Sequence, residues 1–205
     1  MGTEQKIQLY DFASSPNCQR VKIVLEEKKI PYQTIPVDLK KGDQKKADFL
    51  KLNPYGKVPV IVDANTVLYE SCIINEYLEE KYPEPSLMPK DPGRRAKIRI
   101  LIDYGLNHFD SPYQRLRQEL MKEEKERSVE AVENAKKDIK TLLQRFERDI
   151  GDLTYLAGDF SLLDAALIPR FLRLEGFGVL PDSSLPRLSR WLERVKGRPS
   201  VRAIM

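Results

Sequence analysis

Apolar and polar positions alternate in two different ways along the first 82 residues of the chain. Short apolar runs, typical of β-strands, occur at residues 6–12, 31–39, 57–63 and 66–70. Apolar residues at helical spacing predict helices around residues 21–28, 45–53 and 72–78. In the first helix we expect Lys28 to contribute only its aliphatic stem to the apolar face. The predicted order of elements is therefore βαβαββα.

A cluster of prolines separates this pattern from the rest of the chain. Prolines stand at positions 83, 85, 89 and 92. Proline at this density prevents a regular element and stiffens the backbone, so we expect an interdomain linker.

Beyond residue 94 the periodicity is helical throughout. We expect helices within residues 94–122, 129–150, 160–178 and 184–205, the first of them bent near Pro112. Ser161 and Asp164 have the spacing of a capping box at the start of the third helix. The chain is thus predicted to contain an α/β domain over residues 1–82, a proline-rich linker over 83–93 and an all-helical domain over 94–205.

Composition restricts the class of protein. The chain has 205 residues, of which 41% are hydrophobic and 32% charged, as in an ordinary globular protein. No apolar run approaches the roughly 20 residues of a membrane span, and the first residues lack the apolar core of a signal peptide. The two cysteines, Cys18 and Cys72, provide no disulfide framework. We therefore expect a cytoplasmic protein without a membrane partner.

Charge is unevenly placed along the chain. The net charge is +4, and residues 1–82 carry 12 basic and 12 acidic residues, so the excess lies in the second part. The basic residues near the C-terminus are Arg187, Arg190, Arg194, Lys196, Arg198 and Arg202. They could form a patch for an acidic partner, but a solvated helix face is the more common explanation, and we do not expect a nucleic-acid partner.

The stretch "ASSPNCQRV", which begins at Ala13, places chemistry at the start of a predicted helix. Ser14, Ser15 and Cys18 can cap this helix, or they can help hold an anion that the helix terminus stabilises. Other catalytic schemes lack residues. The chain has one histidine, His108, no nucleophile-elbow motif, no phosphate-binding glycine loop and too few ligands for a metal site.

Three longer motifs carry a resemblance to a known family. They are "NPYGKVPVIVD", "LYESCIINEYLEEKYP" and "AGDFSLLDAALIP". In this order and spacing they resemble cytosolic glutathione transferases over nearly the whole chain. The resemblance implies a thioredoxin-like N-terminal domain that binds glutathione as co-substrate. It also implies an all-helical C-terminal domain that binds the second substrate, and it implies no metal.

The resemblance also assigns glutathione-binding residues. Val58 before a cis-Pro59 would present its backbone N–H and C=O to the cysteinyl part of glutathione. Ser71 would bind the γ-glutamyl carboxylate and Glu70 the α-ammonium. Basic residues for the glycyl end of glutathione are Lys40, Lys41 and Lys57. Without the resemblance, Pro59 is an ordinary edge or loop proline, Ser71 a helix cap, and the lysines solvated charges.

A thiolate donor is the catalytic requirement of the family. Ser15 lies five residues before Arg20, a spacing that resembles serine-type members, so we predict Ser15 as the donor. Ser14 is a rival because the two hydroxyls are adjacent. In other members a cysteine forms a mixed disulfide with glutathione, but Cys18 lies one helical turn further along, and we expect it to be a packing residue. Cys72, on the predicted apolar face with Ile73, Tyr77 and Leu78, is expected to be buried.

The second substrate would bind between the two domains, against the first long helix. Candidate lining residues are Tyr104, His108, Phe109 and Tyr113, although some of them could simply pack the interior. The predicted function is conjugation of glutathione to small hydrophobic electrophiles, with peroxide reduction as a further possibility, by a homodimeric transferase.

A second resemblance supports a different class of function. "RVKIVLEEK" and "YPEPSLMP" are similar to stringent starvation protein A, a transferase-fold protein that associates with bacterial RNA polymerase. That family has a Pro-His-Pro element where this chain has Glu84 between two prolines, and it lacks the "SPN" start of the first helix. A ligand carrier with little turnover is a third hypothesis.

Overall fold

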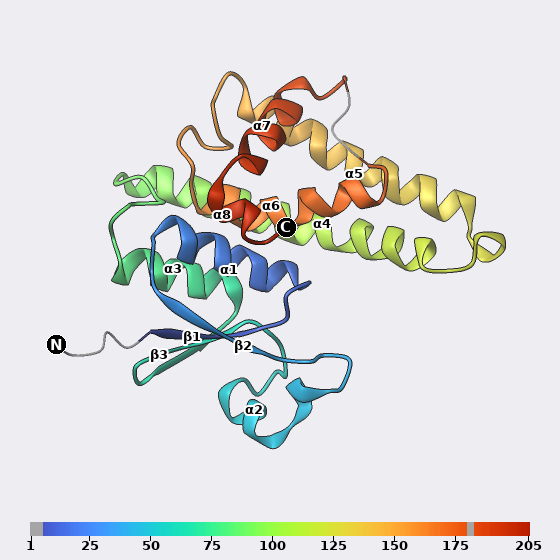
Figure 1. Ribbon diagram of the computed structural model, residues 1–205. Coiled ribbons are helices and arrows are strands. Elements are labelled where there is room, and N and C mark those ends of the chain that lie inside the picture. The colour runs from blue at the N-terminus through green and yellow to red at the C-terminus, as the bar shows by residue number, and fades with distance from the viewer. Residues whose placement is uncertain (1–5, 180–182) are drawn as a thin grey trace. The chain divides into compact units, whose positions relative to one another are not determined.

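The computed structural model describes residues 6–179 and 183–205 (Figure 1). Two compact units divide the chain. The first unit comprises the chain up to Leu87 together with Arg198–Met205, and the second comprises Met88–Gly197. The first unit therefore extends past the expected limit at residue 82, and it also includes the C-terminal segment.

The first unit has the predicted βαβαββα order, with one short helix added from the C-terminus. Its elements are β1 (Ile7–Asp11), α1 (Pro16–Glu27), β2 (Tyr32–Pro36), η1 (Asp43–Lys45), α2 (Ala47–Leu52), β3 (Val60–Asp63), β4 (Thr66–Tyr69), α3 (Ser71–Lys81) and α8 (Pro199–Arg202). The sheet order is β2-β1-β3-β4. Helices α1 and α3 pack together on one face of this sheet, and α2 lies on the opposite side (Figure 1).

Sheet register brings the functional segments to one edge. β1 runs parallel to β2 and pairs Asp11 with Pro36. β3 is antiparallel to β1, and its first residue, Val60, pairs with both Tyr10 and Tyr69. The segments that follow β1, β2 and β4, and the segment that precedes β3, therefore all begin at the same edge of the sheet.

The second unit is helical, as predicted. Its elements are α4 (Pro92–Leu120), η2 (Glu124–Glu126), α5 (Val129–Ile150), α6 (Leu162–Gly176) and α7 (Pro186–Lys196). Helix α6 is central, since every residue from 161 to 171 is buried. The predicted capping box is confirmed, because the Ser161 N–H donates to Asp164 at 2.9 Å. Asp164 also accepts from the Trp191 indole at 2.8 Å, which joins α6 to α7.

One long C-terminal helix was expected, but the structure has two. Gly197 and Pro199 interrupt the helical ladder, and α8 belongs to the first unit. An ion pair attaches this C-terminal segment to α1: Arg198 Nε and Nη2 donate to Glu27 at 2.7 and 2.6 Å. Although burial acts in the opposite direction, these bonds and the Ser200 hydroxyl hold the pKa of Glu27 below its usual value.

Two expectations about apolar faces were wrong. Leu78 of the predicted face of α3 is buried, but Ile73 is 59% exposed and Cys72 is partly exposed, because α3 turns Ile74 rather than Ile73 toward the core. The second expectation was that Lys28 would bury only its aliphatic stem, but its ammonium is buried as well.

The Lys28 ammonium lies in a buried ion pair that ties the proline-rich segment to the first unit. Lys28 Nζ is 2.6 Å from Glu79 Oε2, and both side chains are almost fully buried. The ammonium also donates to the carbonyls of Tyr82 and Pro85 at 2.7 and 2.8 Å. Glu79 accepts in turn from the Leu87 N–H at 3.0 Å. Residues 82–87 are thereby fixed against α1 and α3.

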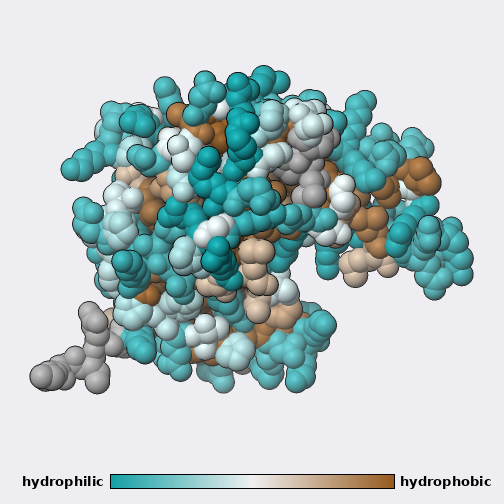
Figure 2. Space-filling model, turned by 45° about the horizontal axis from the view of Figure 1, so that its top comes forward, coloured by the Kyte–Doolittle hydropathy of each residue, from teal (hydrophilic) through white to brown (hydrophobic). Residues whose placement is uncertain are grey.

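One face of the molecule is largely polar. Hydrophilic side chains cover most of the face in Figure 2, and apolar residues appear there in scattered groups. No helix in the described part of the chain is long and apolar enough to cross a membrane.

Lys28→Met tests the buried ion pair. Removing one partner leaves the Glu79 charge buried and unpaired, so we expect the free energy of unfolding to fall by about 3–5 kcal/mol. Lys51→Met is the control, because its ion pair with Asp48 is highly exposed and contributes at most about 1 kcal/mol. Urea unfolding of both variants measures the difference. Equal losses in the two variants would contradict the role given to Lys28.

Candidate functional site

The site is built around the start of α1, where Ser15 is the N-cap. Its Oγ accepts from the Cys18 N–H at 3.4 Å, and its own N–H donates to the Phe12 carbonyl at 2.7 Å. Pro16 occupies the first helical turn, where its missing N–H has no consequence. Since the Ser15 oxygen acts as an acceptor within the helix, its hydroxyl proton is left for a partner outside it.

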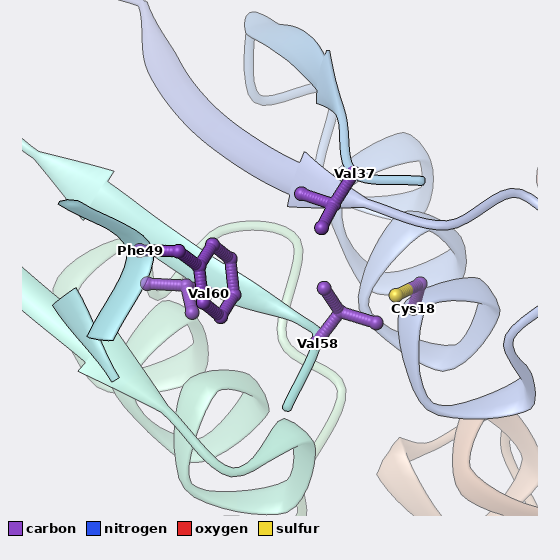
Figure 3. Close-up of a cluster of buried hydrophobic side chains, with 5 residues drawn as sticks. All are labelled: Cys18, Val37, Phe49, Val58 and Val60. Atoms are coloured by element: carbon purple, nitrogen blue, oxygen red, sulfur yellow. The ribbon is translucent and has the colours of Figure 1, made fainter. Parts of the chain in front are cut away.

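Cys18 belongs to an apolar cluster beneath this turn. It is fully buried with Val37, Phe49, Val58 and Val60, and the Cys18 and Val58 side chains face each other (Figure 3). Burial raises the pKa of the Cys18 thiol from 9.0 to about 12. The thiol is therefore protonated at neutral pH, as expected of a packing residue.

Val58 and Pro59 precede β3, and the peptide bond between them is cis, as predicted. Asn53 holds the loop before them. The buried Asn53 amide donates to the Lys57 carbonyl at 2.7 Å, and its oxygen accepts from the Tyr55 N–H at 3.0 Å. Within residues 6–179 and 183–205, the Val58 N–H donates no hydrogen bond.

Glu70 and Ser71 join β4 to α3. Glu70 has φ +69° and ψ 106°, an unusual conformation for a residue with a side chain, which costs of order 1–3 kcal/mol. Ser71 is buried and is the first residue of α3, where the N–H groups of the first turn have no partners within the helix. The junction therefore presents free donors and the positive end of the helix dipole.

The three candidate lysines are exposed. Lys40 and Lys41 follow β2 in a turn held by Asp38, whose Oδ1 accepts from both of their backbone N–H groups. Lys57 directly precedes Val58. All three lysines lie in segments at the same edge of the sheet as Ser15 and Ser71.

The four candidate residues for the second substrate differ in exposure within the helical unit. Tyr104 and His108 lie one turn apart on α4, with ring centroids 4.4 Å apart, and His108 is exposed. The Arg145 guanidinium lies 3.7 Å from the centre of the Tyr104 ring. Tyr113 is buried and stacks on Phe109 at 5.5 Å, so its ring packs the interior of the unit. A role for these residues in substrate binding stays a prediction.

The geometry brings together Ser15, Val58, Ser71 and the lysines at one edge, but it also shows residues that sequence reasoning missed. Asn53 was expected only as the last residue of the helix around residues 45–53. An asparagine directly before proline in "NPYG" is the available signal, since its amide can hold a turn. No cluster of three potential metal-ligating side chains occurs among the residues described.

Comparison with known proteins identifies this arrangement. Sequence profiles of the glutathione S-transferase N-terminal and C-terminal domains match residues 9–86 and 109–199. The chain is 34% identical to glutathione S-transferase 3 of Zea mays over 204 residues, which cover 95% of this chain and 90% of that protein. The chain belongs to the glutathione S-transferase family. Its class of activity is that of a transferase enzyme.

Two further similar proteins differ in what their names describe. A stringent starvation protein A homolog of Histophilus somni is 34% identical over 184 residues, covering 89% of this chain and 82% of that protein. A glutathione transferase from Burkholderia graminis, solved with two glutathione molecules bound per subunit, superposes with a TM-score of 0.87 at 26% identity. The match covers 97% of this chain and 87% of that chain.

Alkaline unfolding tests the burial of Cys18. Because the folded-state pKa is raised, the folded protein keeps a proton that the unfolded chain loses above pH 9, so stability falls as pH rises from 9 toward 12. We expect the free energy of unfolding of the unsubstituted protein to decline more steeply than that of Cys18→Ala, by roughly 1 kcal/mol per pH unit. Parallel profiles from urea titrations at each pH would contradict the buried thiol.

Proposed function

We propose that this protein is a serine-type glutathione transferase that activates the glutathione thiol at the start of α1. The observation that carries the proposal is the convergence of Ser15, Val58 and Ser71 at one edge of the sheet. The Ser15 hydroxyl can donate to the thiolate of glutathione, and the Val58 backbone can pair with its peptide. The helix N-terminus at Ser71 can bind a carboxylate. The glutathione-bound relative from Burkholderia graminis supports the same ligand.

Glutathione would lie across this edge of the sheet. The Val58 backbone pairs with the cysteinyl residue, as in strand addition. The first turn of α3 receives the γ-glutamyl carboxylate through the Ser71 N–H and hydroxyl, and Glu70 accepts from the α-ammonium. Lys40, Lys41 and Lys57 supply positive charge for the glycyl carboxylate.

Catalysis follows from stabilisation of the thiolate. The thiol proton passes to solvent, and the sulfur then accepts the Ser15 O–H and lies near the positive end of α1. The thiolate attacks an electrophilic carbon, a C–S bond forms, and the leaving group departs with its electron pair. The electrophile is a small hydrophobic molecule for which Tyr104 and His108 are the remaining candidate binding residues, since the Tyr113 ring packs the interior. Reduction of a peroxide is a second reaction open to the same thiolate.

We also propose that the protein is a cytoplasmic homodimer. Large apolar side chains of the first unit that are exposed in the single chain include Tyr55 at 65% and Ile73 at 59%. Burial of these side chains against a second copy would remove apolar surface from water.

A partner-binding role without catalysis is the second candidate. It is favoured by the similarity to the stringent starvation protein A homolog over 89% of this chain. The SPN start of α1 and Glu84 in the linker favour the enzyme instead, because the chain departs from that family at both places. Absence of glutathione binding at millimolar concentration would decide for the partner-binding role.

Ser15→Ala tests the thiolate donor. Loss of one hydrogen bond made to the developing charge lowers turnover by about 100-fold. We expect this loss in conjugation of glutathione to an activated aryl chloride, with glutathione affinity by calorimetry nearly unchanged. Ser14→Ala is the control and should retain activity, while Cys18→Ala, which removes packing against Val58 but no donor, should lose less activity than Ser15→Ala. Loss confined to Ser14→Ala or to Cys18→Ala would transfer the catalytic role to that residue.

Ser71→Ala tests the carboxylate site. Removing a hydrogen bond to a charged group should raise the dissociation constant of glutathione about tenfold or more, as measured by calorimetry. Ser111→Ala makes the same change at an exposed position of α4 and should leave affinity unaltered. Equal affinity in both variants would place the γ-glutamyl group elsewhere.

A further inference from the structure

Arg20 is a buried cation without a carboxylate partner. The side chain extends from α1 toward α3 and is only 3% exposed. Nη1 donates to the Cys72 sulfur at 3.6 Å, while Nε and Nη2 are buried without any hydrogen-bond partner. Among the residues that the structure describes, no Asp or Glu forms an ion pair with Arg20. The neighbouring buried charge of Lys28, by contrast, has Glu79 at 2.6 Å.

A buried guanidinium needs a counter-charge, because it stays protonated and its desolvation is costly. Arg20 instead contacts the Cys72 sulfur, so negative charge that develops on this sulfur during a reaction lies beside the guanidinium. Cys72 is also the second residue of α3, where the helix N-terminus favours an anion. It is partly exposed, so a small reagent can reach it.

We propose that Cys72 is a site of reversible modification by glutathione-type disulfides, with Arg20 as the counter-ion of its thiolate. The Cys72 thiol releases its proton to solvent, and the thiolate attacks one sulfur of the disulfide. A Cys72–glutathione disulfide bond forms as the original S–S bond breaks, and the other half leaves as glutathione thiolate. The low-molecular-weight disulfide is the oxidant, and a thiol reverses the reaction.

The two cysteines differ in their surroundings. Cys18 faces an apolar cluster and is fully buried, whereas Cys72 faces a guanidinium and is partly exposed. The modification is therefore selective for Cys72. Its effect on the enzyme rests on the proposed function: a glutathionyl group on Cys72 stands beside Ser71 and competes with glutathione for the first turn of α3.

Incubation of the folded protein with glutathione disulfide, followed by mass spectrometry and peptide mapping, tests the site. We expect one glutathionyl group on Cys72, none on Cys18, and full reversal by dithiothreitol. Cys72→Ser should remain unmodified. Arg20→Met should slow the reaction by about tenfold or more, and Arg20→Lys should retain most of the rate. An unmodified Cys72, or an unchanged rate in Arg20→Met, would overturn the proposal.

A second measurement covers the case in which Arg20→Met does not fold. Cys72 of the unsubstituted chain should react faster in the native protein than in denaturant, where Arg20 is no longer beside it, and Cys18 should show the reverse order. The opposite order for Cys72 would overturn the proposal. Bis(2-hydroxyethyl) disulfide, which needs no glutathione site, separates the two hypotheses. Its reaction with Cys72 in a protein that binds no glutathione would support the modification site and refute the transferase.

Discussion

The contact between Cys18 and Val58 is the interaction on which the site depends. Sheet register brings the ends of β1 and β4 and the start of β3 to one edge, but register alone does not set the position of a helix. Cys18 lies one turn after Ser15, and Val58 is the residue proposed to bind the glutathione backbone. Their packing fixes the start of α1 against the loop before β3. Protein interiors are close-packed, so this contact keeps a hydroxyl and a backbone edge at a defined separation. A misplacement of about 1 Å between such groups is enough to reduce a rate substantially.

Polar contacts along α1 also fix the position of this helix. Glu27, at the end of the helix, holds the C-terminal segment through Arg198, and Lys28 holds the proline-rich segment through Glu79. Gln19, near its start, donates to the carbonyls of Ala13 and Ile204 at 3.2 Å each. The helix that presents Ser15 is therefore tied to the sheet, to the segment after α3 and to the end of the chain. Its N-terminus can carry a fixed partial charge because the rest of the helix cannot easily shift.

Local patterns predicted most of the elements, and contacts between distant residues explain where prediction failed. The βαβαββα order, the helical second unit and the Ser161–Asp164 capping box follow from periodicity and from residues three or four positions apart. The break at Gly197 and Pro199 was present in the sequence, but the docking of α8 on α1 depends on a pair 171 residues apart. The contact between Arg20 and Cys72 spans 52 residues. Lys28 appeared as a lysine at an apolar position because Glu79, which explains it, belongs to another helix. Placement of the candidate site needed both the family resemblance and the sheet register, since an isolated Ser15 or Ser71 is indistinguishable from an ordinary helix cap.

The helix terminus that we propose stabilises the glutathione thiolate also lies within one turn of the protein's own Cys18 thiol, and burial distinguishes the two sulfurs. A free thiol and Cys18 start from similar acidities, and both meet the field of α1 and the Ser15 hydroxyl. Cys18 lies in an apolar cluster, where desolvation outweighs the hydrogen bonds that favour its anion, and its pKa rises to about 12. A substrate thiol at the partly exposed surface of Ser15 keeps the stabilising contacts without that desolvation. The Cys18 thiol can therefore pack beneath the site while staying protonated, so it does not act as a second nucleophile there.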